Sequence, residues 1–123
     1  MHALLSTAVK LVLFPGVLIF FIHNPGIVSG AESASSLFEG LCAVCHGVGG
    51  KGDGPSAAGL HPKPANFTDC KIMAKESDQT LIKIIKEGGQ SVGRSTVMPS
   101  WKDSLSESQV LSLVKYIRGL CKK

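Results

Sequence analysis

Five consecutive residues, Cys42-Ala43-Val44-Cys45-His46, constrain the fold of this 123-residue chain more than any other feature of its sequence. On one turn of a helix, thiols three positions apart lie on the same side, and the imidazole of His46 follows directly. Cys-x-x-Cys-His is the attachment signature for c-type haem, in which the two thiols add to the two vinyl groups of the porphyrin. The imidazole is then held beneath the iron as its proximal ligand. Because the motif occurs once, we expect the chain to fold around one covalently bound haem c.

Two other uses of paired cysteines fit the sequence less well. A thioredoxin-like redox pair requires a neighbouring βαβ pattern, and no such pattern is present. A structural zinc site requires further Cys or His pairs at close spacing, which Cys70 and Cys121 do not supply. We therefore favour covalent haem attachment. A disulfide-bonded binding module without haem is the alternative.

The first 31 residues differ in character from the rest of the chain. Residues 11–22 are uncharged and follow Lys10, but the run is too short to cross a bilayer. This pattern is typical of a secretory signal peptide, and cleavage after Ala31 would leave residues 32–123 as the mature domain. An uncleaved anchor is the alternative. We predict a periplasmic or otherwise exported protein, which touches a membrane only if the N-terminal segment is kept.

Size and charge exclude two broad classes of protein. A chain of 123 residues is long enough for one small domain but not for a multi-domain enzyme. Its 13 Lys and Arg residues give a formal net charge of +4, yet they are scattered along the sequence, and only Lys122 and Lys123 are adjacent. Nucleic-acid-binding surfaces need clustered basic residues, so we predict no nucleic-acid partner.

Hydrophobic spacing and capping residues predict an all-α chain, because no stretch alternates between apolar and polar residues as a strand would. The first helix should cover residues 36–46, with a capping box that begins at Ser36. Two further helices should run from Ser77 to Gly88 and from Ser106 to Cys121. The glycine- and proline-rich residues 47–66 predict a long loop, which Phe67 would attach to the core.

A second axial ligand to the iron must come from elsewhere in the chain. We favour Met98, because it lies in a loop just before Pro99, where its side chain is free to point at the iron. The alternatives are Met73, which we expect to fill a gap in the core, and His61, which we expect to be solvated. A thioether ligand would raise the reduction potential relative to a second imidazole.

These motifs resemble those of class I monohaem c-type cytochromes, in particular small bacterial cytochrome c domains. The resemblance covers nearly all of residues 32–123. Besides the CAVCH motif, it rests on Phe38 and on three segments: GDGP at residues 52–55, MPSW at residues 98–101 and LVKYI at residues 113–117.

The resemblance implies a cytochrome c fold, in which three main helices and long loops pack around the haem. It places Gly40 of the first helix against Tyr116 of the last. It also implies that the carbonyl of Pro55 accepts a hydrogen bond from Nδ1 of His46, which would orient the proximal ligand and raise its basicity. Trp101 would belong to the surroundings of the haem.

The resulting functional prediction is an exported electron carrier. His46 and Met98 stay bound while the iron cycles between its ferric and ferrous states, so no position is open for a substrate and we predict no enzymatic turnover. The partners would be redox proteins that dock transiently at the haem edge of a monomer, where Lys51, Lys63 and Lys102 lie in loops. The alternative is a haem c subunit, or a gas-responsive sensor domain, docked in a larger respiratory oxidoreductase.

Cys70 and Cys121 remain once the haem has taken the other two cysteines. Two leftover cysteines in an exported chain favour a disulfide. Two buried free cysteines are the alternative, and this prediction rests on the number of cysteines alone.

Overall fold

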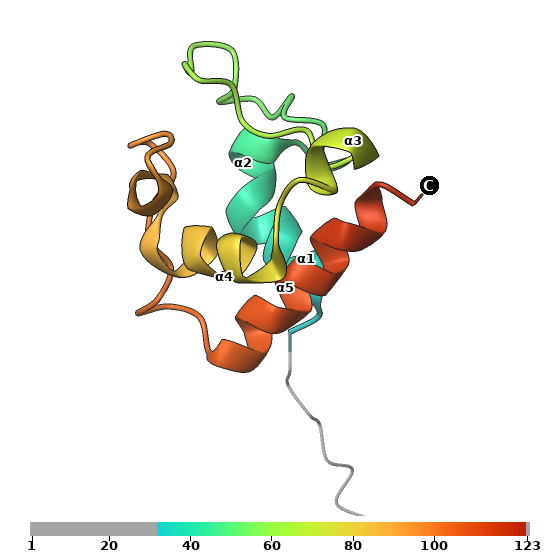
Figure 1. The fold of residues 1–123 in the computed structure, drawn as a ribbon, viewed down its shortest axis with the longest axis vertical. Helices are drawn as coiled ribbons and strands as arrows, with labels where there is room; N and C mark the ends of the chain where they lie inside the picture. Colours follow the sequence, from blue (N-terminus) through green and yellow to red (C-terminus); the bar gives the residue numbers. More distant parts are fainter. Residues whose placement is uncertain (1–31, 123) are drawn as a thin grey trace, which may run out of the picture.

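The computed structural model describes residues 32–122, which form helices and loops and contain no β-strand (Figure 1). The elements in chain order are α1 (Ala34–Leu37), the π-helical turn η1 (Phe38–Cys42), α2 (Ala43–His46), α3 (Cys70–Met73), α4 (Asp78–Glu87), the 3-10 turn η2 (Gly89–Val92) and α5 (Glu107–Leu120). The all-α prediction is thus confirmed for the described part of the chain. No helix there combines the length and the hydrophobicity needed to cross a membrane. The predicted signal peptide and its cleavage after Ala31 fall outside the described residues.

The first predicted helix is a run of three elements, α1, η1 and α2. It begins earlier than predicted, because Oγ of Ser33 accepts a hydrogen bond from the backbone N–H of Ser36 at 3.1 Å and so caps α1. The predicted cap, Ser36, lies inside α1, and the capping box expected there is not formed. The earlier start adds a turn that buries Leu37 beside the fully buried Phe38.

The other two predicted helices are confirmed as α4 and α5. Oγ of Ser77 caps α4, and a capping box between Ser106 and Gln109 caps α5. The sequence prediction missed α3, whose N-terminus is capped by the carboxylate of Asp69. A helix of four residues is too short to show a hydrophobic period, so the cap was its only signal in the sequence.

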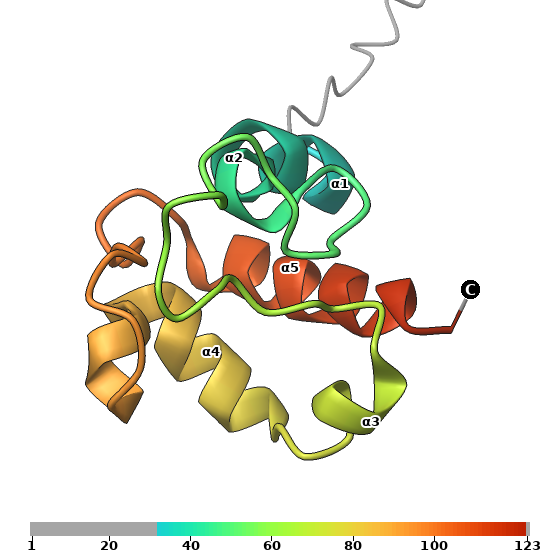
Figure 2. The ribbon, with the colours of Figure 1, turned by 90° about the horizontal axis from the view of Figure 1, so that it is seen from above.

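One hydrophobic core holds these elements together, with α1 and α4 both packed against α5 (Figure 2). The predicted contact between Gly40 and Tyr116 is wrong, because Gly40 is exposed and a Cβ at its position would meet no atom within 4 Å. Instead, the ring of Phe38 packs on that of Tyr116 at a centroid distance of 5.2 Å. Residues two positions apart on a helix face nearly opposite sides, so burying Phe38 turns Gly40 outward.

Candidate functional site

A cavity of about 660 Å³ opens between α2, α4, α5 and the loops that join them. Its wall is mostly apolar and includes several core side chains: Phe38, Met73, Leu81, Ile85, Leu113 and Ile117. A volume of this size and an apolar lining with few polar groups are typical of cofactor sites in proteins.

Most residues predicted from the sequence meet at this cavity. Cys42, Cys45 and His46 come from the end of the first helical run, whereas Met98 and Trp101 come from the segment between η2 and α5, and all five line its wall. The structure therefore unites two motifs that lie far apart in the chain.

Some predicted residues lie elsewhere. Pro55 and His61 are exposed and do not belong to the cavity wall. Among the three lysines predicted near a haem edge, only Lys63 lines the cavity, and its Nζ donates hydrogen bonds to two backbone carbonyls of the preceding loop. Lys51 and Lys102 are exposed outside it.

His46 is the last residue of α2 and is only 9% exposed. Its Nδ1 lies 3.3 Å from the backbone carbonyl oxygen of Ala65, and its ring stacks on that of Phe67 at a centroid distance of 4.5 Å and an interplanar angle of 19°. A carbonyl oxygen can only accept, so Nδ1 carries the proton and Nε2 keeps its lone pair. Burial lowers the pKa of His46 and outweighs the opposing effect of the Ala65 hydrogen bond, which keeps the ring neutral.

The carbonyl that faces Nδ1 of His46 thus belongs to Ala65, and not to Pro55 as the resemblance implied. The reason lies in how the loop covers the end of α2. The N–H groups of Gly54 and Ser56 donate to the carbonyls of Cys45 and Val44, at 3.1 and 2.9 Å. These bonds hold the intervening proline on the outside, where it is exposed.

Gly54 is required for this close contact, because a Cβ there would lie 2.5 Å from the carbonyl oxygens of Ala43 and Val44. Farther along the loop, the N–H of Phe67 donates to the carbonyl of Gly50 at 2.7 Å. This second contact brings residues 65–67 over the imidazole ring. Phe67 is buried, which confirms the prediction that it attaches the loop to the core.

The two cysteines of the motif are half-buried at the wall, and both thiols are free. Burial raises the pKa of Cys42 to about 11, and the charge of Cys45 adds to this effect. The wall therefore presents an uncharged thiol at neutral pH, in keeping with its apolar character. In the described part of the chain, no three His, Cys, Asp or Glu side chains gather as they would to hold a metal ion.

Met98 is held in place by the glycine pair that follows α4. The N–H of Gly89 donates to the carbonyl of Met98 at 3.2 Å. At Gly88, whose φ is 84°, a Cβ would lie 2.8 Å from the same carbonyl oxygen. Met73 also lines the cavity, from α3, and is almost completely buried, which confirms that it fills the core. The wall thus offers two thioethers, whereas His61 is exposed and does not line it.

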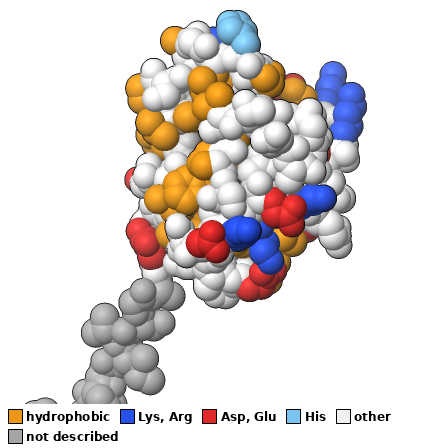
Figure 3. Space-filling model, turned by 90° about the vertical axis from the view of Figure 1, so that its left-hand side faces the viewer, with side chains coloured by type: hydrophobic (Ala, Val, Ile, Leu, Met, Phe, Trp, Pro, Cys, Tyr) orange, Lys and Arg blue, Asp and Glu red, His pale blue; other side chains and the backbone are white. Residues whose placement is uncertain are grey.

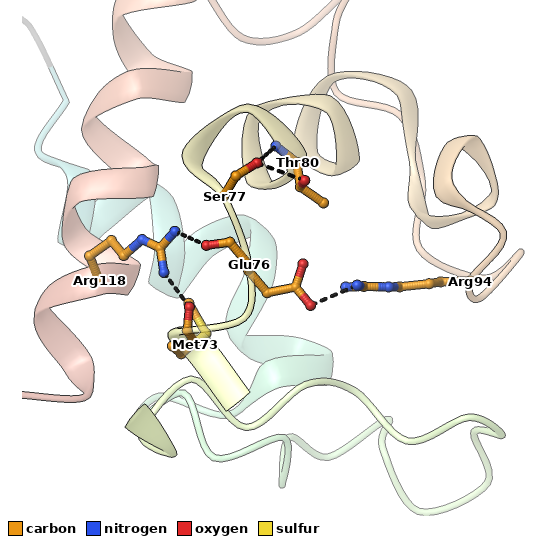
Figure 4. A network of polar contacts seen from close by, with 6 residues as sticks. All are labelled: Met73, Glu76, Ser77, Thr80, Arg94 and Arg118. Atoms are coloured by element: carbon orange, nitrogen blue, oxygen red, sulfur yellow. Dashed lines mark hydrogen bonds and ion pairs between the residues drawn. The ribbon is translucent and has the colours of Figure 1, made fainter. Parts of the chain in front are cut away.

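A polar network crosses from α5 to the segment that carries Met98 (Figure 4). Arg118 in α5 donates to the backbone carbonyls of Met73 and Glu76, and the Glu76 carboxylate lies 2.7 Å from Nη2 of Arg94. Both Glu76 and Arg94 line the cavity. Sequence reasoning missed this network, because its partners lie 18 to 45 positions apart and no local pattern marks them.

Comparison with known protein families gives a direct match. A family model described as Cytochrome c covers residues 31–120. Three similar proteins are cbb3-type cytochrome c oxidase subunits: FixP of Bradyrhizobium diazoefficiens, 34% identical over 91 residues, FixP of Azorhizobium caulinodans, 29% identical over 96 residues, and CcoP of Azospirillum brasilense, 26% identical over 92 residues. These matches cover 73%, 78% and 75% of this chain, but 27%, 29% and 29% of the relatives. The chain thus spans less than a third of the length of these relatives.

A solved structure, the KustC0563 c-type cytochrome, is also similar. It superposes with a TM-score of 0.57 and is 28% identical in sequence. The likeness covers 72% of this chain and 98% of that protein.

Proposed function

The chain belongs to the cytochrome c family and has the fold of that family, as its sequence predicted, and we propose that it is an exported one-electron carrier with histidine and methionine ligation. Family membership makes it an electron-transfer haem protein. One haem c would be joined to Cys42 and Cys45, with His46 and Met98 as axial ligands. The observation that carries this proposal is that these four residues, from two distant segments, line one cavity.

The cavity fits a haem in both size and chemistry. Its volume of about 660 Å³ and its apolar wall suit a flat macrocycle with apolar faces. Because Nδ1 of His46 faces the Ala65 carbonyl, the lone pair of Nε2 is available to iron. When bound, the haem would supply an iron that accepts and releases one electron.

The chain itself would position the ligands and keep water away. Phe67 and the Ala65 carbonyl fix the plane of the His46 ring, while Gly88 lets the backbone of Met98 approach closely. Ligands held by packed elements need little rearrangement when the oxidation state changes. With His46 and Met98 both holding the iron, a substrate or gas would have no place to bind, which favours a carrier over an enzyme.

Redox partners would dock where the cavity wall reaches the surface. Val44 and Val97 line the cavity and are 50% and 54% exposed, and Lys63 lies on the same wall. Figure 3 shows hydrophobic side chains gathered along part of the face on which η2 and the following loop lie, with charged side chains beside them. A small apolar patch of this kind suits a brief encounter between redox proteins. We propose that the protein acts as a monomer in the periplasm, after export through residues 1–31.

A second candidate function follows from the relatives. Three of them are oxidase subunits, and each is more than three times as long as the region matched here. The present domain could accordingly serve as a haem c subunit of a larger respiratory oxidoreductase. It would then copurify with that complex from membranes, whereas a free carrier would elute alone at the size of a monomer.

The optical spectrum of the purified holoprotein tests the ligand assignment. A carrier should show a sharp α-band when reduced, a weak near-infrared band of iron–thioether ligation when oxidised, and no change with carbon monoxide. Met98→Leu should abolish the near-infrared band, whereas Met73→Leu, which changes the other methionine of the wall, should leave it. The opposite pattern would assign Met73, and a shift with carbon monoxide would indicate a sensor with an exchangeable site.

A further inference from the structure

The two cysteines that the haem would not use lie side by side at the surface. Cys70 begins α3 and is exposed, and Cys121 follows the last residue of α5 and is half-buried. Although they are 51 positions apart in the sequence, the thiol of Cys70 contacts the backbone carbonyl of Cys121 as a hydrogen-bond donor. Both thiols are free in this structure, and the two cysteines are in direct contact.

The approach of α3 to α5 does not depend on the cysteines. In α5, Arg118 donates from Nη1 to the carbonyl of Met73, the last residue of α3, at 2.5 Å (Figure 4). Its Nε donates to Oδ1 of Asp78, at the start of α4, at 2.8 Å. Contacts other than those of the cysteines thus hold α3 beside the C-terminal end of α5, where Cys70 and Cys121 meet.

We propose that Cys70 and Cys121 form an intramolecular disulfide in the exported protein. The proposal rests on the proposed function in one respect, namely that the haem takes up Cys42 and Cys45. Oxidation of two thiols to one S–S bond releases two electrons and two protons. An oxidised thiol-oxidase protein would accept them: the thiolate of one cysteine attacks its disulfide, the other thiolate displaces the mixed disulfide, and the oxidant leaves as a dithiol.

The bond would join the two ends of a segment that supplies one side of the cavity wall. The ring from residue 70 to residue 121 contains α3, α4, the Met98 segment and α5, whereas the CAVCH motif lies outside it. The haem attachment would fix the proximal side through Cys42 and Cys45, and the disulfide would limit the movement of the distal side. We therefore expect reduction of the bond to lower the denaturant concentration at which the iron–thioether band is lost.

Counting thiols in the full-length holoprotein, exported to the periplasm and unfolded in denaturant with a maleimide, tests the proposal. The thioether-linked cysteines do not react, so the expected count is zero before reduction and two after it. Cys70→Ser should give one reactive thiol without reduction, and Cys121→Ser should do the same. A peptide that joins residue 70 to residue 121 should appear in a non-reduced digest.

Two labelled thiols in the unreduced holoprotein would overturn the proposal, and so would a disulfide-linked dimer on a non-reducing gel. Failure of the proposed function gives a different result. Without attached haem, the Soret absorbance and the mass of one haem would be missing, and Cys42 and Cys45 would be labelled after reduction as well.

Discussion

Phe67 should control the orientation of the proximal histidine, and two substitutions can separate this effect from simple loss of volume. Its ring is 7% exposed, stacks on His46 at 4.5 Å and meets Phe38 edge-on at 6.1 Å. Phe67→Ala removes the whole ring from the core, which typically costs about 3–5 kcal/mol of unfolding free energy. Phe67→Leu keeps most of the volume, so it should cost less than about 1.5 kcal/mol for packing, plus about 1 kcal/mol for the lost ring contacts.

Guanidinium unfolding of the ferric holoprotein, followed by circular dichroism, measures both losses. Electron paramagnetic resonance of the ferric protein reports the plane of the imidazole ligand, and it should change in Phe67→Leu because the stacked ring is gone. Phe38→Leu is the matched control, since Phe38 belongs to the same aromatic cluster and its ring packs against those of Phe67 and Tyr116. That control should lower stability while leaving the imidazole signal in place.

Unchanged stability and an unchanged imidazole signal in Phe67→Leu would show that the Ala65 carbonyl, and not the stacked ring, orients His46. An equally large change of the signal in Phe38→Leu would show that general packing of the aromatic cluster, and not the stacking of Phe67 on His46, sets the orientation.

Three further perturbations have defined outcomes. Gly54→Ala should cost about 2 kcal/mol of unfolding free energy, because its Cβ would lie 2.5 Å from two backbone carbonyl oxygens. The control Gly59→Ala, which has open space around it, should leave the unfolding free energy nearly unchanged in the same assay. Glu76→Gln should cost up to about 1 kcal/mol of unfolding free energy and weaken the near-infrared band, because the ion pair of Glu76 with Arg94 holds the segment that carries Met98. The control Glu107→Gln, which removes an exposed ion pair, should leave the band intact. In the chain without haem, where no iron holds Nε2 of His46, burial lowers the pKa of this imidazole below its ordinary 6.5. The unfolded chain then binds a proton that the folded chain excludes, and the unfolding midpoint of the haem-free protein should fall as pH drops from about 7.5 to 6. His61→Gln should keep that slope, and a flat profile would contradict the assignment.

The sequence was sufficient for the features that depend on local chemistry. The CAVCH motif identified the attachment residues, because covalent attachment and axial ligation need those residue types in that order. The caps at Ser77 and Ser106 fixed the starts of α4 and α5, since a side-chain oxygen there satisfies N–H groups within three residues. Met98 was singled out because it precedes a proline, and the fold does bring it to the cavity.

Contacts between distant segments could not be predicted from the sequence, and the hydrogen bond between His46 and Ala65 illustrates why. Pro55 and Ala65 both lie in the long loop after His46, and nothing in their local sequence decides which carbonyl meets Nδ1. That choice is made by the bonds from residues 54 and 56 to the end of α2, which turn the proline outward, and by the bond from Phe67 to Gly50, which brings residue 65 inward. A sequence motif shows which residues form a turn, whereas the path of the whole loop decides which of these residues faces the site.

The two sides of the cavity differ in whether sequence neighbours or distant segments hold them in shape. The proximal side is built from neighbours in sequence, in which α2 and its loop carbonyls form one continuous stretch. The distal side is assembled from α3, α4, η2 and α5, which are joined by Arg118, by the Glu76–Arg94 pair and, as we propose, by a disulfide. Cross-links matter most where a wall is made of separate segments, because each segment otherwise adds its own freedom to move. Ligand exchange at the iron should therefore begin on the Met98 side, and cutting its cross-links should accelerate exchange there before it affects the His46 side.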